Sequence, residues 1–128
     1  MLVDQQSGRI LATAFGTGHT HDFALFKRSR LWMCATSRCL ADAGYRGLSR
    51  FHANSQTPHK KSKHHPLTAE RKADNKQLSR ERMVVEHALG RLKVFRILSE
   101  RYRNRRKRFG LRFNLLAALV NHQLQRNT

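Results

Sequence analysis

From Thr68 to Leu98 the sequence reads TAERKADNKQLSRERMVVEHALGRLKVFRIL. This stretch contains no proline and a single glycine, Gly90, and residues that favour helices dominate it. It predicts one long helix in which Thr68 is the N-cap, Glu70 lies in the first turn and Gly90 is the weakest position. In a chain of 128 residues, a helix of this length decides the architecture.

Two stripes of side chains run along the predicted helix. At about 100° per residue, Arg82, Glu86 and Lys93 fall within roughly 40° of one another and form a polar stripe. An apolar stripe is centred roughly 110° away around the helix and should face a core. Its members are Val85, Ala88, Leu92 and Phe95. A carboxylate flanked by two cations at the margin of a buried face suits a site that binds a metal ion and a phosphodiester.

The polar stripe also has a purely structural interpretation. Arg82 and Glu86 stand at i and i+4, where an ion pair on a solvated face stabilises a helix by only about 0.2–0.5 kcal/mol. For an arbitrary helix this interpretation would be preferred. The choice therefore depends on the rest of the sequence.

Upstream of the long helix, the first sixteen residues predict a β-hairpin. Strands at Leu2–Val3 and Ile10–Phe15 flank a turn that contains Gln5-Gln6-Ser7-Gly8. Asp4 belongs to this turn, a position that favours Asp for structural reasons. Because the chain opens directly in a strand, we expect sheet partners upstream of residue 1.

The next segment predicts three short elements. A short helix over residues 21–26 would have Asp22 as its cap. The apolar run Cys39-Leu40-Ala41 predicts a buried strand that ends at Asp42. Residues 48–54 would form one or two helical turns, and residues 58–66 a basic loop or an edge strand. Trp32 and the phenylalanines are expected in the core.

The charge balance indicates a polyanionic partner. The chain has 26 Lys and Arg against 8 Asp and Glu, a net charge of +18 and a pI near 11.6. Nucleic acid would relieve the self-repulsion and release condensed counterions. Six of the eight residues from Arg101 to Arg108 are basic, which favours contact with a DNA backbone over a merely solvated turn. A final helix is predicted over residues 111–124.

Membrane, secreted and zinc-binding classes receive no support. The sequence has no lipidation motif, no transmembrane run and no export signal, so a cytoplasmic location is expected. Cys34 and Cys39 are too few for a disulfide framework and should both be reduced. Their spacing and the scattered histidines disfavour zinc.

The stripe and the segments around it resemble the endonuclease domain of DDE-type transposases of bacterial insertion sequences. Arg82, Glu86 and Lys93 match the Arg-x3-Glu-x6-Lys core of a signature of that family, although Ser79 stands where the family often has tyrosine. Four further segments carry the likeness over nearly the whole chain: residues 8–13 (GRILAT), 41–47 (ADAGYRG), 91–98 (RLKVFRIL) and 102–106 (YRNRR).

The resemblance implies a role for each of these residues. Asp42 matches the second catalytic Asp and Glu86 the closing Glu, and both would bind Mg²⁺ or Mn²⁺. Arg82 and Lys93 would steady the Glu and a phosphate. The DNA backbone would be held by the basic run, namely Arg101, Arg103, Arg105, Arg106, Lys107 and Arg108. The family places its first Asp on a strand before the hairpin, so this carboxylate is expected to be absent from the chain.

The resemblance thus implies an α/β, RNase H-like domain that lacks its first strand and has long helices in its C-terminal half. Residues 1–128 would form one partial DDE endonuclease domain, with a strand-rich half (1–67) that carries Asp42 and a helical half (68–128) that carries Glu86. Its partners would be element ends and target DNA near the bacterial nucleoid, with a homodimer in the transposition complex. The chain is expected to be truncated and inactive alone.

Two alternatives stay open. The first is a non-catalytic basic nucleic-acid-binding protein, including a transposase remnant that binds DNA without cutting it. The second is an RNA-binding or ribosomal-type protein, for which composition alone would suffice but which the polar stripe does not predict.

His19 and His21 lie near Asp22 and would approach the site, but a turn at a helix start explains them equally well.

Overall fold

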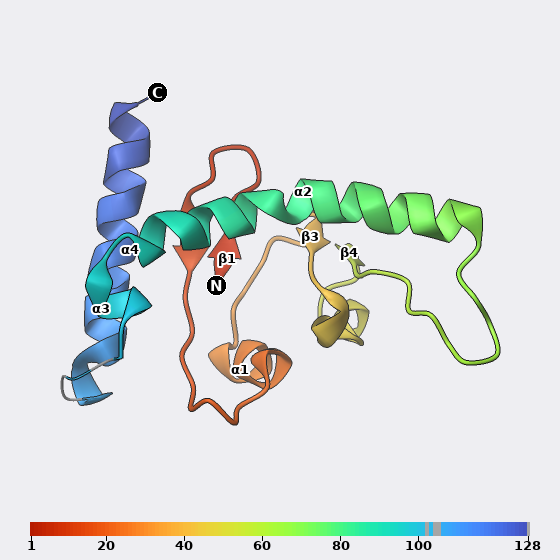
Figure 1. The fold of residues 1–128 in the computed structure, drawn as a ribbon, viewed down its shortest axis with the longest axis horizontal. Helices are drawn as coiled ribbons and strands as arrows, with labels where there is room; N and C mark the ends of the chain where they lie inside the picture. Colours follow the sequence, from red (N-terminus) through yellow and green to blue (C-terminus); the bar gives the residue numbers. More distant parts are fainter. Residues whose placement is uncertain (102, 104–105, 128) are drawn as a thin grey trace. The chain divides into compact units, whose positions relative to one another are not determined.

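A computed structural model describes residues 1–101, 103 and 106–127 (Figure 1). The chain divides into two compact units. Unit 1 contains Met1–Phe15 and Met83–Thr128, and unit 2 contains Gly16–Arg82. In chain order the described elements are β1 (Leu2–Val3), β2 (Ile10–Ala12), α1 (Asp22–Ser29), β3 (Cys39–Leu40), the 3-10 turns η1 (Ala43–Tyr45) and η2 (Leu48–Arg50), β4 (Ser55–Gln56), α2 (Ala69–Lys93), α3 (Arg96–Ser99), the 3-10 turn η3 (Arg106–Arg108) and α4 (Phe109–Arg126). The fold is mixed α/β, as predicted.

Unit 1 begins with the predicted hairpin. β1 and β2 pair antiparallel, and β2 ends at Ala12, three residues before the predicted end. The Asp4 carboxylate accepts hydrogen bonds from the Ser7 amide, at 2.9 Å, and from the Ser7 hydroxyl. These bonds hold the pKa of the Asp4 carboxyl below its usual value. Gly8 closes the turn with a φ of +69°, which favours glycine. Asp4 therefore has the turn role that its sequence context predicts.

The free edge of β2 is covered by a side chain from α4. The Asn121 amide accepts a hydrogen bond from the Ile10 backbone N–H at 2.8 Å and donates one to the Ile10 carbonyl at 2.9 Å. An amide side chain can replace a neighbouring strand in this way because it carries both a donor and an acceptor. The contact joins the hairpin to α4 and satisfies an otherwise open edge.

The core of unit 1 lies where the hairpin, α2 and α4 meet. Its buried residues are Ile10, Ala88, Leu92, Ala117 and Val120, and Phe95 and Leu98 pack against them. Ala88 and Leu92, from the predicted apolar stripe, are 0% and 2% exposed. The stripe therefore faces a core, as its periodicity predicted.

The long helix is shorter than predicted at its C-terminal end. Thr68 does cap α2, because its hydroxyl accepts a hydrogen bond from the Arg71 backbone N–H at 3.3 Å. The helix runs through Gly90 but stops at Lys93 rather than Leu98. Phe95 adopts an extended conformation (φ −78°, ψ 116°) and starts the four-residue helix α3. The chain turns here because Phe95 and Leu98 both pack against the core, whereas Val94 is 79% exposed.

The two halves of α2 belong to different units. Residues up to Arg82 are part of unit 2, and residues from Met83 onward are part of unit 1.

The final helix of unit 1, α4, starts two residues earlier and ends two residues later than predicted. Phe15 packs edge-on against Phe109 and Phe113, with ring centroids 5.6 and 5.0 Å apart, and this aromatic contact extends α4 at its N-terminal end.

Unit 2 contains a parallel strand pair that the sequence did not predict in full. β3 was expected, and its partner β4 was not. The connection between them includes η2, which covers only Leu48–Arg50 of the helical turns predicted for residues 48–54. The buried His52 side chain explains the early end, because its Nε2 lies 2.6 Å from the Ser37 carbonyl and holds the chain beside the segment that leads into β3. Residues 58–66 form a loop without a strand.

Two further expectations concern single residues of unit 2, Trp32 and the two cysteines. Trp32 is 84% exposed, so its assignment to the core was wrong. It lies two residues after Arg30, whose left-handed conformation (φ 47°) ends α1. Cys34 and Cys39 are both free thiols, as expected.

No described helix combines the length and the apolar composition that a membrane span requires.

Candidate functional site

Asp42 lies two residues after the end of β3, where the sequence predicted it. The Ala41 backbone N–H donates to the Gln56 carbonyl at 3.0 Å, so the strand pairing extends to the residue before Asp42. One carboxylate oxygen of Asp42 then accepts a hydrogen bond from the Gly44 N–H at 2.9 Å and caps η1. The other oxygen lies 3.8 Å from the Arg82 guanidinium. Backbone pairing and a cap therefore orient this carboxylate.

Two ion pairs hold the β3–β4 region against the first half of α2. Arg82 pairs with Asp42, and Arg38 pairs with Glu81 at 2.9 Å. Arg38 also donates hydrogen bonds to the Gln56 side chain in β4, at 3.2 and 2.5 Å. Glu81 and Arg82, which are consecutive in α2, thus bind the segments on either side of β3, and Arg38 links Glu81 to β4. In the described part of the chain, Asp42 is the ion-pair partner of Arg82, whereas the structural interpretation of the polar stripe had paired Arg82 with Glu86.

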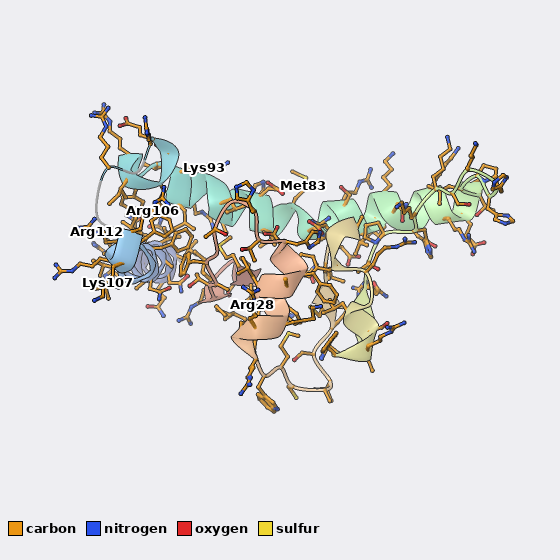
Figure 2. The ribbon with its side chains drawn as sticks, turned by 90° about the horizontal axis from the view of Figure 1, so that it is seen from below. Arg28, Met83, Lys93, Arg106, Lys107 and Arg112 are labelled. Atoms are coloured by element: carbon orange, nitrogen blue, oxygen red, sulfur yellow. The ribbon has the colours of Figure 1, made fainter. Side chains whose placement is uncertain are left out.

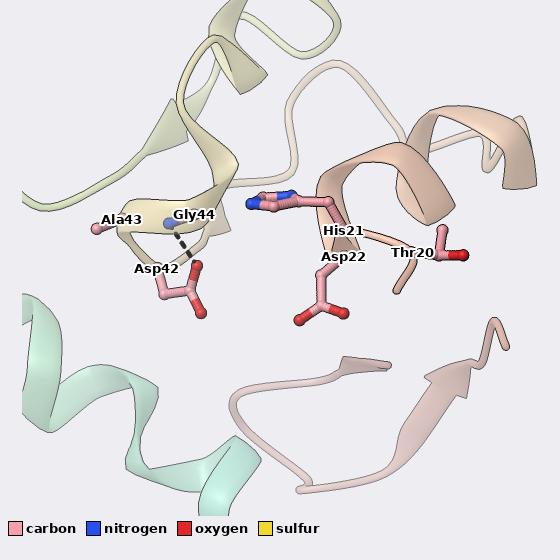
Figure 3. Close-up of a pocket in the computed structure, with 6 residues that line it drawn as sticks. All are labelled: Thr20, His21, Asp22, Asp42, Ala43 and Gly44. Carbon is pink, nitrogen blue, oxygen red and sulfur yellow. Dashed lines mark hydrogen bonds between the residues drawn. The ribbon is translucent and has the colours of Figure 1, made fainter. Parts of the chain in front are cut away.

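A pocket of about 490 Å³ opens beside Asp42, and its lining residues are Thr20, His21, Asp22, Asp42, Ala43 and Gly44. In Figure 3 the carboxylates of Asp22 and Asp42 point into the same open space, and the His21 ring points toward Gly44. The absence of a side chain at Gly44 allows the Asp42 carboxylate and the His21 ring to lie close to its backbone. A Cβ atom there would lie 3.0 Å from a carboxylate oxygen of Asp42 and 3.7 Å from the His21 ring.

Asp22 is the residue of this pocket that the sequence reasoning misassigned. It was predicted to cap α1, but the cap is His21, whose Nδ1 accepts a hydrogen bond from the Phe23 N–H at 3.3 Å. Asp22 is instead the first residue of the helix, and its carboxylate is free to line the pocket. The run His19-Thr20-His21-Asp22 was the available signal, since it offered two residues able to cap the same helix.

Tyr45, the last residue of η1, packs against α1. Its ring packs on Phe23 and Phe26, with centroids 5.8 and 6.2 Å apart, which fixes η1 against α1. Burial raises the pKa of the Tyr45 hydroxyl, and the negative charges of Asp22 and Asp42 raise it further. The hydroxyl therefore stays protonated at neutral pH and presents a neutral, polar group beside two carboxylates.

The remaining residues of the polar stripe lie on the second half of α2, in unit 1. Glu86 and Lys93 are both exposed, and Lys93 is the last residue of the helix (Figure 2). Glu86 is two residues from the buried Ala88, a separation that places the two side chains on roughly opposite sides of α2. Its side chain is accessible to a ligand from solvent.

The predicted basic run also belongs to unit 1. Arg101, Arg103, Arg106, Lys107 and Arg108 are exposed, and the last three form η3 directly before α4 (Figure 2). Arg105 lies outside the described residues, as do Tyr102 and Asn104 of the same segment. The described cations of the run are therefore accessible, as contact with a DNA backbone requires.

Comparison with known proteins identifies the family. The sequence matches the transposase DDE domain family over residues 1–121, nearly its whole length. The chain belongs to this family of transposase DDE domains. It is also 44% identical, over 124 residues, to the probable transposase for insertion sequence element IS702 of Microchaete diplosiphon. The matched region is 97% of this chain and 45% of that relative, so the chain spans less than half of the relative's length. No solved structure matches the chain.

The donor atoms of this transposase DDE domain are of the kind that hard cations prefer. Asp22 and Asp42 direct carboxylate oxygens into one pocket, and oxygen ligands suit Mg²⁺ and Mn²⁺. Neither pocket carboxylate is fully shielded, and one oxygen of Asp42 already has a backbone donor. Among residues 1–101, 103 and 106–127, however, no three His, Cys, Asp or Glu side chains form a group able to hold a metal ion. Asp22 and Asp42 therefore do not belong to such a group in the described part of the chain.

Proposed function

We propose that the protein containing this DDE domain cuts and joins insertion-element DNA by divalent-metal phosphodiester chemistry. The observation that carries the proposal is the setting of Asp42, which a strand end, a backbone cap and Arg82 orient at an open pocket. Family membership and the transposase relative support it. On this proposal residues 1–128 form a single, partial RNase H-like domain that acts on element ends and target DNA, as a homodimer, in the bacterial cytoplasm at the nucleoid.

Each residue of the proposed site has a separate task. Asp42 and Glu86 would hold Mg²⁺ or Mn²⁺, which, when bound, would activate the attacking oxygen and stabilise the leaving oxygen of the phosphodiester. Arg82 orients Asp42 and offers a cation to a phosphate, and Lys93 offers a second cation from the end of α2. The basic run holds the flanking DNA backbone, which adds affinity and register without reading sequence.

Metal dependence tests the proposed chemistry. The full-length protein is expected to nick and join a duplex that carries an element end in Mg²⁺ or Mn²⁺, and EDTA should abolish both products. Cleavage would be followed on a labelled duplex, with binding to the same duplex measured in EDTA. Binding without any cleavage, across both metals, would favour the alternative of a nucleic-acid-binding protein that does not cut.

The basic run has its own test in the salt dependence of binding. If about six phosphates are neutralised, log K for duplex DNA should fall with log salt at a slope of roughly −5. Replacing Arg106 and Lys107 together with alanine should reduce that slope by about two. The matched control is Arg28→Ala with Arg46→Ala, which removes the same charge from exposed positions in unit 2. A flat salt dependence, or equal effects of the two double variants, would contradict this role.

A further inference from the structure

A second group of cations gathers on unit 2, on residues to which the proposed site assigns no role. Residues 57–76 carry six Lys and Arg against two acids, Glu70 and Asp74. All six cations are exposed. They come from the loop before α2 and from the first turns of that helix, and we call them the unit 2 basic surface: Lys60, Lys61, Lys63, Arg71, Lys72 and Lys76.

The loop that carries three of these lysines is fastened to α2. The Asn75 side chain accepts a hydrogen bond from the His59 N–H at 2.8 Å and donates one to the His59 carbonyl at 2.9 Å. Within the loop, the Ser62 hydroxyl accepts a bond from the His65 N–H at 3.0 Å. The lysines therefore stand on a backbone with a defined shape, which lowers the entropy lost when they bind a ligand.

The fastened loop and the helix enclose an open concavity of about 850 Å³. Lys60, Arg71 and Thr68 are among the residues that line it. One of its two acids, Asp74, lies 3.7 Å from the His59 side chain. The positive end of the helix dipole of the 25-residue α2 lies at the same place. Lys60, Arg71 and the helix dipole thus favour an anion here, against the two carboxylates in the lining.

The composition of this surface distinguishes among polyanions. Residues 57–76 contain no Phe, Tyr or Trp, whereas single-stranded nucleic acid is bound largely by stacking on aromatic rings. Binding to a membrane surface requires a helix with a large apolar face beside the cations, and the exposed apolar residues of this segment are small, namely Pro66, Ala69 and Ala73. Contacts made only by cations suit the regular phosphates of a duplex.

We propose that the unit 2 basic surface is a second contact site for the backbone of duplex DNA, in addition to the run at Arg101–Arg108. The inference rests on the proposed function, because it gives the same DNA substrate a further contact. Phosphate contacts fix the position of a protein on DNA without reading bases. Two such contacts, one on each unit, would neutralise more phosphates than the basic run alone.

The test is the salt dependence of duplex binding in a triple variant, Lys60→Ala, Lys61→Ala and Lys63→Ala. The matched control, Arg28→Ala with Arg46→Ala and Arg50→Ala, removes the same charge from exposed residues elsewhere in unit 2. If each lysine neutralises a phosphate, the plot of log K against log salt should become less steep, its slope decreasing in magnitude by about three. Affinity near 0.15 M salt should fall by roughly 100-fold. The control triple should leave the slope unchanged.

A variant without charge loss tests the role of the loop shape. Asn75→Ala removes both hydrogen bonds to His59 but keeps every cation, so affinity should fall several-fold while the slope stays near the parent value. Circular dichroism would verify that α2 is intact in each variant. Equal slopes in the loop triple and the control triple would overturn the inference. So would a loss confined to single-stranded DNA, duplex RNA or phosphatidylserine vesicles.

The two proposals fail in different assays. Metal-dependent nicking by the parent protein, with no effect of the loop triple on duplex binding, would leave the proposed function in place and remove only the second contact site. A reduced slope in the loop triple, without nicking under any metal condition, would keep the contact site and remove the proposed chemistry.

Discussion

Replacing Asp42 with asparagine in the full-length protein is expected to lower DNA nicking by about a thousand-fold or more, the scale on which removal of one preorganised electrostatic group acts. The amide oxygen of Asn can still accept the hydrogen bond from Gly44, so η1 should keep its cap. The amide carries no charge, however, and would serve a hard cation poorly. Duplex binding should stay close to that of the parent, and the free energy of unfolding should fall by at most about 1 kcal/mol, because the lost ion pair with Arg82 is partly exposed and 3.8 Å long.

Glu86→Gln is expected to lower DNA nicking to the same extent. It should leave stability unchanged, because Glu86 is exposed and the substitution opens no cavity. Two controls match these variants. Asp4→Asn changes the turn carboxylate of the hairpin, and Glu100→Gln changes an exposed acid that pairs with Arg96 at 3.8 Å. Both control proteins should nick DNA at the parent rate. If Asp4→Asn abolished nicking, or if Glu86→Gln melted early but still cut when folded, the assignment of the carboxylates would be wrong.

The largest effect on stability is expected from Leu92→Ala. Leu92 is 2% exposed and belongs to the core cluster of unit 1. Its truncation removes buried methyl groups and leaves a cavity, at a cost of about 3 kcal/mol. Leu111 provides the matched control because it is 72% exposed on α4, where the same truncation should change stability by less than about 0.5 kcal/mol.

The comparison would be made by urea unfolding followed through circular dichroism at 222 nm. A lower midpoint with an unchanged slope identifies a change in stability rather than in the unfolded state. The Leu92→Ala midpoint should fall clearly below that of the parent, and the Leu111→Ala midpoint should coincide with it. Equal losses for the two variants would mean that the apolar stripe of α2 does not face the core.

The features that the sequence predicted correctly are those with local causes. A Thr68 hydroxyl at the start of a helix-forming stretch is sufficient for a cap, and a period near 3.6 is sufficient to place Ala88 and Leu92 on one face. The hairpin followed from its turn residues, and Asp42 from the end of an apolar run. In each case, neighbours within one or two turns of chain determine the structure.

The features that were missed depend on contacts between distant residues. α2 ends at Lys93 because Phe95 packs on the core, and helix propensity carries no information about that packing. β4 consists of Ser55 and Gln56, polar residues that pair with β3 only because His52 brings the chain back to Ser37. At α1 either His21 or Asp22 can serve as the cap. Which one does so decides whether a carboxylate faces the pocket of Asp42.

The hydrogen bonds between Asn121 and Ile10 also constrain the order in which the protein folds during synthesis. Unit 2 is continuous in sequence, whereas unit 1 needs partners that are 111 residues apart. At about 5–20 residues per second, the ribosome reaches Asn121 roughly ten seconds after Ile10. Unit 2 therefore has time to fold first, while the outer edge of β2 in the nascent hairpin remains unpaired. Until α4 emerges from the ribosome, a chaperone would bind at that edge, or two nascent chains would aggregate through it.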